Sequence, residues 1–405
     1  MTRQFRSGLV SSTSNPSSWA TEPKPHPQTQ EQADANGGPK SSLASPESYA
    51  QPFCDFMTNN PTSFHAVASF CAQLQQHGFT RLSERDLWSS VLKAGGKYYC
   101  SRNDSSLIAF SIGSEYKTGN GFGIVAGHVD AVCAKLKPVS KMSNKAGFMQ
   151  LGVAPYAGSM GSTWWDRDLG IGGRVLVRNQ DTGAIESKLV KLDWPIARIP
   201  TLAVHFGAAS QGPFNKETQA VPIIGLDNSD ILGNQQGNAQ EDDDIKPNTF
   251  AASQPSKLMK VIAKKLGISD LSTIVNWELE LFDTQPAQVG GLNKEFIFAG
   301  RIDDKLCCYS AQEALLASED TASSGIIKMV GMFDAEEIGS LLRQGARSNY
   351  LSSVMSASAI DAGIPQLSMH SIRATTGNMD PGLGVQLFKG FFDYFEEVDR
   401  EFRDF

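Results

Sequence analysis

The sequence predicts an α/β protein in which a mixed sheet covered by helices is interrupted by an inserted β-rich domain. Two observations lead to this fold class. Strand patterns alternate with helical patterns in residues 47–138 and again in 294–405, as expected of a sheet whose faces are covered by helices. Residues 139–293 are instead rich in strands and turns, so we expect them to form a separate domain.

Composition narrows the class of protein further. The 405 residues suffice for about two to three domains. A net charge of −7 argues against a partner that is nucleic acid or an anionic membrane, and no apolar run approaches the ~18 residues of a membrane span. The six cysteines show no C-x-x-C spacing, which indicates reduced thiols of an intracellular protein rather than a cysteine zinc site.

The amino-terminal part divides into a polar tail and two helices. Residues 1–46 are rich in Ser, Pro, Gln and Asn, so we expect a disordered tail. Phe53, Phe56 and Met57 then follow helical spacing. After the break at "NNPTS", Ser63 is expected to cap a second helix over residues 64–77.

The remaining elements alternate along the chain. Short strands are expected at "KYYCSR", "SLIAFSIG" and "GFGIVAGHVDA". After the inserted domain come the strand "FIFAG", a helix over residues 304–317, the strand "IIKMVGMF" and a helix after Gly339. No internal repeat interrupts this order.

The first chemically suggestive pair ends the strand "GFGIVAGHVDA". His128 and Asp130 are two residues apart, so their side chains point the same way in an extended chain. Asp130 can therefore orient the His128 ring, as carboxylates do for metal-binding histidines. Taken alone, such a pair is more often structural.

Two further strands end in acidic groups. "FIFAG" leads to Asp303 and Asp304, and "MVGMF" leads to Glu336 and Glu337. Carboxylates about 5 Å apart repel by roughly 3 kcal/mol at an effective dielectric near 20, so a half-buried pair needs a proton or a cation. Taken alone, Asp303 or Asp304 could cap the helix that follows, and the glutamate pair could be a solvated turn. However, the strands all end in such groups, and open α/β sheets bind ligands at the edge formed by the carboxyl ends of their strands.

His370 follows an alternating apolar pattern in "PQLSMHSIR" and is the fourth candidate. Nitrogen and oxygen ligands without thiolates suit zinc, manganese or cobalt. One glutamate of the pair would bind the metal, and the other would act as general base on water. His205, in "RIPTLAVHFG", has the pattern of a packed strand histidine.

From about residue 49 to residue 405 the chain resembles the aspartyl aminopeptidase and vacuolar aminopeptidase I family of metallopeptidases, most closely the fungal vacuolar type. The resemblance rests on a series of motifs: "NNPTSFHAV", "GHVDA", "LGVAPYAG", "STWWDRDLGIGGRV", "KLVKLDWPIARIPTLAVHFG", "RIDDKLC", "DAEEIGS" and "PQLSMHSIRATTG".

The resemblance implies a zinc aminopeptidase that releases single N-terminal residues from peptides, in the cytoplasm or vacuole. Its catalytic α/β domain would hold two metals, and its inserted dimerisation domain would build dodecamers. By motif, the implied metal ligands are His128, Asp303 as the bridge between two metals, Glu337 and His370. The same motifs make Glu336 the general base, Asp130 the orienting partner of His128, and His205 a residue that reaches a neighbouring subunit's active site.

The chain departs from the family between about residues 355 and 361. The family has a longer stretch there, with one more aspartate ligand; Asp361 instead matches its "DAGIPQ" pattern. A metal held by His128, Asp303 and Glu337 would keep three ligands, and a metal shared by Asp303 and His370 only two. We therefore expect at most one tightly bound zinc. The alternative function is a silent subunit, from an isoform or a truncated gene model, that retains the assembly domain.

Overall fold

The computed structural model describes residues 44–207, 212–227, 245–318, 324–352 and 363–402. The described residues all belong to one compact unit. The predicted disordered tail lies almost entirely outside the described residues, and so does the stretch at 355–361 where the family resemblance breaks. Among the described helices, none is long and apolar enough to cross a membrane.

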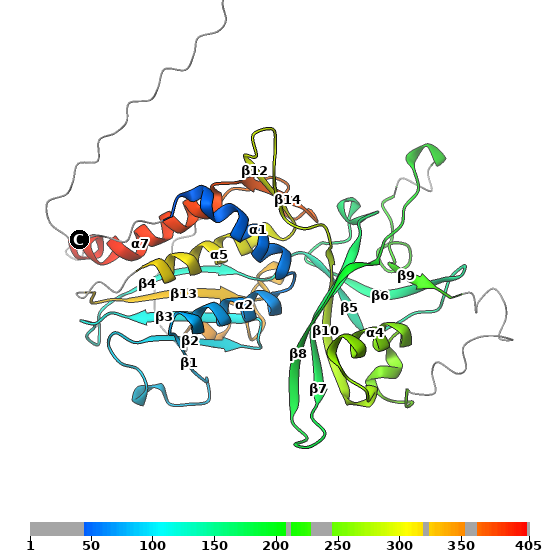
Figure 1. The fold of residues 1–405 in the computed structure, drawn as a ribbon, viewed down its shortest axis with the longest axis horizontal. Coiled ribbons are helices and arrows are strands. Elements are labelled where there is room, and N and C mark those ends of the chain that lie inside the picture. Colours follow the sequence, from blue (N-terminus) through cyan, green and yellow to red (C-terminus); the bar gives the residue numbers. More distant parts are fainter. Residues whose placement is uncertain (1–43, 208–211, 228–244, 319–323, 353–362, 403–405) are drawn as a thin grey trace, which may run out of the picture. The chain divides into compact units, whose positions relative to one another are not determined.

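A five-stranded sheet forms the first layer, in the order β1-β2-β3-β13-β4 (Figure 1). β13 runs parallel to β4 and antiparallel to β3, which confirms the predicted mixed sheet. Every residue of β3 and β13 is buried, as expected for strands covered on both faces. The strands are β1 (Thr80–Arg81), β2 (Lys97–Arg102), β3 (Ser106–Ile112), β4 (Phe122–His128) and β13 (Ile327–Phe333).

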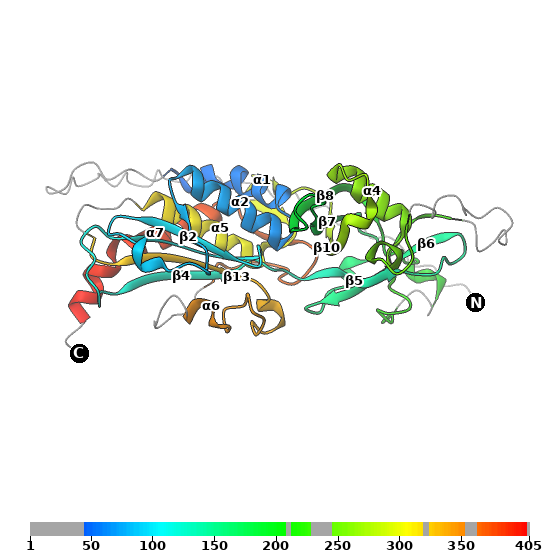
Figure 2. The ribbon, with the colours of Figure 1, turned by 90° about the horizontal axis from the view of Figure 1, so that it is seen from below.

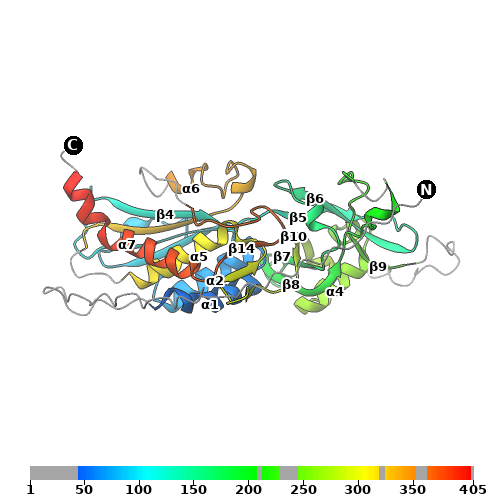
Figure 3. The same ribbon diagram turned by 90° about the horizontal axis from the view of Figure 1, so that it is seen from above.

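Helices cover this sheet unequally. α1 (Ala50–Asn59), α2 (Ser63–Gln76) and α5 (Ile302–Ala317) lie on one face, and the short α6 (Asn349–Ser352) lies on the other (Figures 2 and 3). The long carboxyl-terminal α7 (Asp380–Phe402) packs against α5. One large apolar core fills the space beneath the helices, and a smaller core covers the opposite sheet face.

Two helix predictions need correction. The cap of α2 is Thr62 rather than Ser63, because the Thr62 side chain accepts a hydrogen bond from the His65 N–H at 3.4 Å. No helix follows Gly339 directly, since residues 341–348 form turns and bends. Gly339 and Ser340 have φ values of 101° and 61°, which a right-handed helix cannot contain.

The β-rich segment forms a six-stranded sheet in the order β8-β7-β10-β5-β6-β9, with every neighbouring pair antiparallel. α4 (Ser256–Leu266) contributes to its separate apolar core. The predicted boundary at residue 138 falls inside β5 of this sheet. The strands are β5 (Cys133–Lys141), β6 (Phe148–Tyr156), β7 (Leu169–Arg178), β8 (Ile185–Ala197), β9 (Ile223–Leu226) and β10 (Ile274–Asp283).

The strand "FIFAG" lies outside both large sheets. It is β12 (Phe296–Ala299), which pairs antiparallel with β11 (Gln288–Gly290) and β14 (Ala374–Gly377) in a third sheet. The expectation that three strands of one sheet present the candidate residues is therefore wrong for this strand. Five residues connect β11 to β12, so the two strands pair as a short hairpin. Antiparallel pairing of this kind needs no crossover connection.

Short 3-10 helices complete the described part of the chain. They are η1 (Pro46–Tyr49), η2 (Trp88–Ser90), η3 (Ser162–Trp164), η4 (Val204–Phe206), η6 (Phe250–Ser253), η7 (Leu271–Thr273) and η8 (Glu336–Ile338). All six cysteines are free, in agreement with the reduced thiols expected from the sequence.

Candidate metal centre

The carboxyl ends of β4 and β13 lie side by side, because Phe333 is the register partner of His128. The residues that follow these parallel strands therefore meet at one edge of the sheet, as predicted. Asp130 follows β4, and Glu336 and Glu337 follow β13 in the single turn η8. The Asp130 carboxylate accepts hydrogen bonds from the Glu336 and Glu337 backbone N–H groups, each at 3.2 Å.

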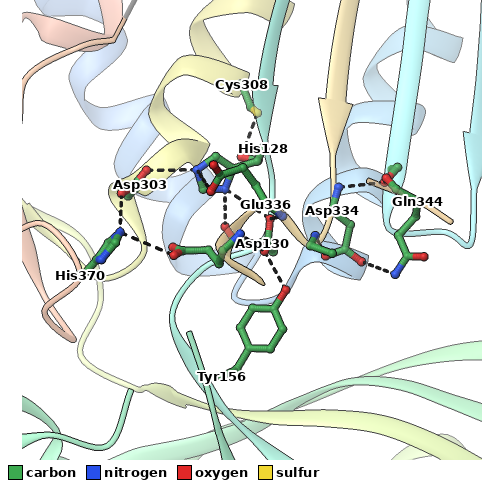
Figure 4. A network of polar contacts seen from close by, with 12 residues as sticks. His128, Asp130, Tyr156, Asp303, Cys308, Asp334, Glu336, Gln344 and His370 are labelled. Atoms are coloured by element: carbon green, nitrogen blue, oxygen red, sulfur yellow. Dashed lines mark hydrogen bonds and ion pairs between the residues drawn. The ribbon is translucent and has the colours of Figure 1, made fainter. Parts of the chain in front are cut away.

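Asp303 lies between the two imidazoles of the site (Figure 4). Its Oδ1 is 3.2 Å from His128 Nε2, and its Oδ2 is 3.3 Å from His370 Nε2. The residue stands in the first turn of α5, directly after the third sheet. A carboxylate in this position can serve two cations at once, one beside each ring.

The adjacent glutamates face different histidines. Glu336 Oε2 is 3.7 Å from His128 Nε2, and Glu337 Oε2 is 3.5 Å from His370 Nε2. Successive side chains of a 3-10 turn point about 120° apart, so one turn can aim the two carboxylates at different partners. The Glu337 side chain is 4% exposed and that of Glu336 is 53% exposed.

His370 belongs to a turn rather than to the strand suggested by its apolar neighbours. It lies between the isolated bridge residue Leu367 and β14, with φ of 63°. Arg301 and Ala335, just before the acidic residues, also have left-handed φ values, of 61° and 63°. Such conformations cost non-glycine residues roughly 1–2 kcal/mol each, and they cluster at functional sites.

The structure groups the ligands differently from the sequence-based hypothesis. Asp303, Glu337 and His370 each offer one ligand atom, and these atoms lie within 4.8 Å of one another. Within the described residues, no second group of three or more ligand atoms lies this close together, and His128 is not in the group. The reason is the turn geometry of η8, which directs Glu337 toward His370 and leaves Glu336 beside His128.

The electrostatics of the cluster favour a bound cation. Burial raises the pKa of Glu337 to about 7, and its Oε1 atom is buried without a hydrogen-bond partner. Burial opposes protonation of His128, but Asp130 and Asp303 raise its pKa to about 11. The hydrogen bond with His128 lowers the pKa of Asp303. A divalent ion would neutralise the excess negative charge of these carboxylates and would give the unpartnered Glu337 Oε1 a ligand contact. The residues therefore fit zinc.

A pocket adjoins the ligands. It includes Asp303, Glu337 and His370 in its wall, and its volume is about 20 Å³. This is room for roughly one water-sized group. Its lining also contains apolar residues from β10, from β14 and from the helices η3 and α5; among them are Trp164, Leu281, Ile302 and Ala374, with Ile372 just before β14.

His205 lies elsewhere in the fold. It is exposed in η4 and contacts Phe206, with ring centroids 4.4 Å apart and ring planes inclined by 34°. It is neither a packed strand histidine nor part of the pocket wall. One residue that contacts the site had no role assigned from the sequence: Tyr156 donates a hydrogen bond to Asp130 at 2.8 Å. Their separation of 26 residues gives no periodic signal.

Comparison with known proteins assigns the family. A model of the aminopeptidase I zinc metalloproteases (M18) matches residues 56–360 and 355–392. The chain belongs to the M18 family. It is 34% identical to vacuolar aminopeptidase 1 of Saccharomyces cerevisiae, over 88% of this chain and 90% of the relative. M18 membership makes the chain a metal-dependent aminopeptidase, and these homologues do not favour the silent-subunit alternative.

Solved M18 structures share the fold. The mApe1 protein of Chaetomium thermophilum superposes with a TM-score of 0.81 at 44% identity, covering 88% of this chain and all of that one. The mApe1 dodecamer of Saccharomyces cerevisiae gives a TM-score of 0.75 at 29% identity, covering 89% of this chain and 99% of that one.

The alignments also show where this M18 chain is short. The two ranges that match the family model overlap at residues 355–360. The alignment with vacuolar aminopeptidase 1 runs over 467 positions, whereas 88% of this chain is only about 356 residues. With the aspartyl aminopeptidase of Aspergillus oryzae the identity is 40%, but the aligned part is 75% of this chain and 63% of that relative.

Proposed function

We propose that Asp303, Glu337 and His370 hold the tightly bound zinc of this aminopeptidase, and that Glu336 is its general base. The observation that carries the proposal is the convergence of three ligand atoms within 4.8 Å. The unpartnered Glu337 Oε1 beside them supports it. Zinc in such a site supplies Lewis acidity, which makes water a stronger acid and polarises a carbonyl group.

The surrounding residues suit release of single N-terminal residues from peptides. Glu336 is half exposed and free of the three-ligand group, so it can take a proton from the attacking water and pass it to the leaving amine. Asp130 holds the His128 ring, with its backbone oxygen 3.1 Å and its Oδ1 3.3 Å from Nδ1. The acidic cluster would attract the positively charged α-amino group of a peptide.

We propose one tightly bound zinc per chain. On the His128 side, the described protein ligands are His128 and the shared Asp303. Two ligands hold zinc more weakly than three, because structural and catalytic zinc sites use at least three protein ligands. The sequence-based hypothesis gave three protein ligands to the metal beside His128 and two to the metal beside His370. We propose the reverse, while the expectation of at most one tightly bound zinc is unchanged.

The chain also has features of an assembling subunit. One neighbour in structure is a dodecamer, and Leu202, Val204 and Phe206 are 51%, 69% and 62% exposed beside His205. We infer a homo-oligomer in which this surface is covered and His205 meets a neighbouring subunit. Similarity to a vacuolar aminopeptidase supports residence in the vacuole or cytoplasm.

Glu336→Gln tests the mechanism. It removes the base and keeps the shape of the side chain, so kcat for leucyl and aspartyl or glutamyl amide substrates should fall about 10²- to 10⁴-fold. Bound zinc, counted by mass spectrometry, should stay at one per chain. Glu47→Gln, on the exposed η1 helix, is the matched control and should leave both values unchanged.

Three results would contradict the proposal. Full turnover by Glu336→Gln would exclude Glu336 as the base. A zinc count of two in the unmodified protein would exclude the single-site assignment, and a count of zero with no turnover would favour the silent subunit.

A further inference from the structure

The Asp130 carboxylate contacts both His128 and the turn that carries Glu336 and Glu337. Its side chain is 4% exposed. Its Oδ1 lies beside His128 and accepts the Glu336 N–H, and its Oδ2 accepts the Glu337 N–H and the Tyr156 hydroxyl. Asp130 therefore contacts both the ring of His128 and the turn that carries the two glutamates. At the ring, its backbone oxygen also lies 3.1 Å from Nδ1.

Tyr156 contacts the Asp130 carboxylate from a different sheet. It is the last residue of β6 in the six-stranded sheet, whereas Asp130 follows β4 of the five-stranded sheet. Figure 4 shows its ring below the cluster, with the hydroxyl pointing at Asp130. At 2.8 Å, this is the shortest of the contacts that Asp130 makes with the site.

The tyrosine is itself held from several directions. Its backbone pairs with Cys133 of β5, and its N–H donates to Ser159 Oγ at 3.1 Å. The Lys135 ammonium lies 4.2 Å from the ring centroid. Burial and the nearby Asp130 carboxylate raise the pKa of Tyr156 far above its usual range, so the hydroxyl keeps its proton and remains a donor.

We propose that Tyr156 is a positioning residue through which the β-rich domain sets the geometry of the metal centre. The inference rests on the proposed roles of His128, Glu336 and Glu337. Without the hydroxyl, Asp130 Oδ2 keeps only the Glu337 N–H among these partners, so the orientation of the carboxylate is less firmly fixed. Partners that orient metal ligands typically contribute 10- to 100-fold in metal affinity or activity.

Tyr156→Phe tests the inference, because it removes one hydroxyl and keeps the ring. We expect kcat to fall 10- to 100-fold with KM within about twofold. Zinc should bind more weakly in competition with a chelator, and the backbone amides of Glu336 and Glu337 should exchange hydrogen faster. The last two measurements report on the site without relying on turnover.

Tyr99→Phe is the matched control. It deletes the hydroxyl of a tyrosine in β2, which accepts a hydrogen bond from Gln75 of α2. It should leave kcat and zinc affinity unchanged. A Tyr156→Phe protein with normal kcat and normal zinc affinity would overturn the inference. So would losses that merely match the unfolded fraction, measured by circular dichroism against the control.

Failure of the proposed function has a different signature. If Glu336→Gln stays active, the assignment of the base is wrong whatever Tyr156→Phe does. If Glu336→Gln is inactive and Tyr156→Phe is normal, the mechanism stands and Tyr156 has no positioning role.

Discussion

At the scale of single residues, His65 shows how burial creates pH dependence away from the site. The His65 ring contacts Thr62 Oγ1 through Nδ1 at 2.8 Å. Burial, with the positive charges of Lys305 and Lys191, lowers the pKa of His65 to about 4 from its ordinary value of 6.5. The folded protein therefore binds fewer protons than the unfolded chain between these two values.

We expect His65 to make folding less favourable as pH falls from 6.5 toward 4. Above pH 6.5 the imidazole is neutral in both states and the effect is absent; near pH 4 it reaches about 3 kcal/mol. His65→Gln should therefore show a smaller loss of unfolding free energy than the unmodified protein over this window. Urea denaturation at several pH values measures the difference.

His77→Gln is the control, because it replaces an exposed histidine just after the same helix. It should keep the pH dependence of the unmodified protein. Equal slopes for His65→Gln and the unmodified protein would show that His65 does not contribute.

At the scale of secondary-structure elements, strand β7 depends on a glycine. Gly173 has φ of 146°, and a Cβ atom there would lie 2.0 Å from the Glu278 carbonyl oxygen of β10. Both the backbone conformation and the close approach exclude a side chain. β7 lies between β8 and β10, so a disturbance at this point affects both neighbouring pairs.

Gly173→Ala should destabilise the protein by about 2–4 kcal/mol, since the strand must shift away from β10. Differential scanning calorimetry would show the loss as a lower Tm. Gly390→Ala, in α7 with open space around its Cα, adds the same methyl group and should not lower Tm. An unchanged Tm for Gly173→Ala would mean that the two strands separate at little cost.

At the scale of the whole molecule, exposed apolar side chains point to assembly. Val204 and Phe206 are mostly exposed on η4, and burying a Phe side chain contributes roughly 1.5–3 kcal/mol. Phe206→Ser should therefore shift the protein toward smaller species in size-exclusion chromatography with light scattering. Leu292→Ser, at a site that is 99% exposed, should leave the distribution unchanged. Equal shifts in both variants would place the interface elsewhere.

The residues that the structure brings together at the candidate metal centre were predicted from the sequence, and so were β2, β13 and most of α2. Helical spacing and apolar runs depend on neighbours a few residues away. The motifs around His128 and Glu337 likewise lie in short continuous stretches. Such local patterns are sufficient to predict which elements form and which side chains are available for chemistry.

Only the tertiary structure decided how these residues are paired. It placed β12 in a third sheet, His370 on a turn, Glu337 beside His370 and Tyr156 against Asp130. The contacts of Glu337 with His370 and of Tyr156 with Asp130 join residues 26 or more positions apart, and they depend on how the three sheets pack together. No local periodicity encodes that packing, because it results from the summed burial and hydrogen bonding of the whole chain.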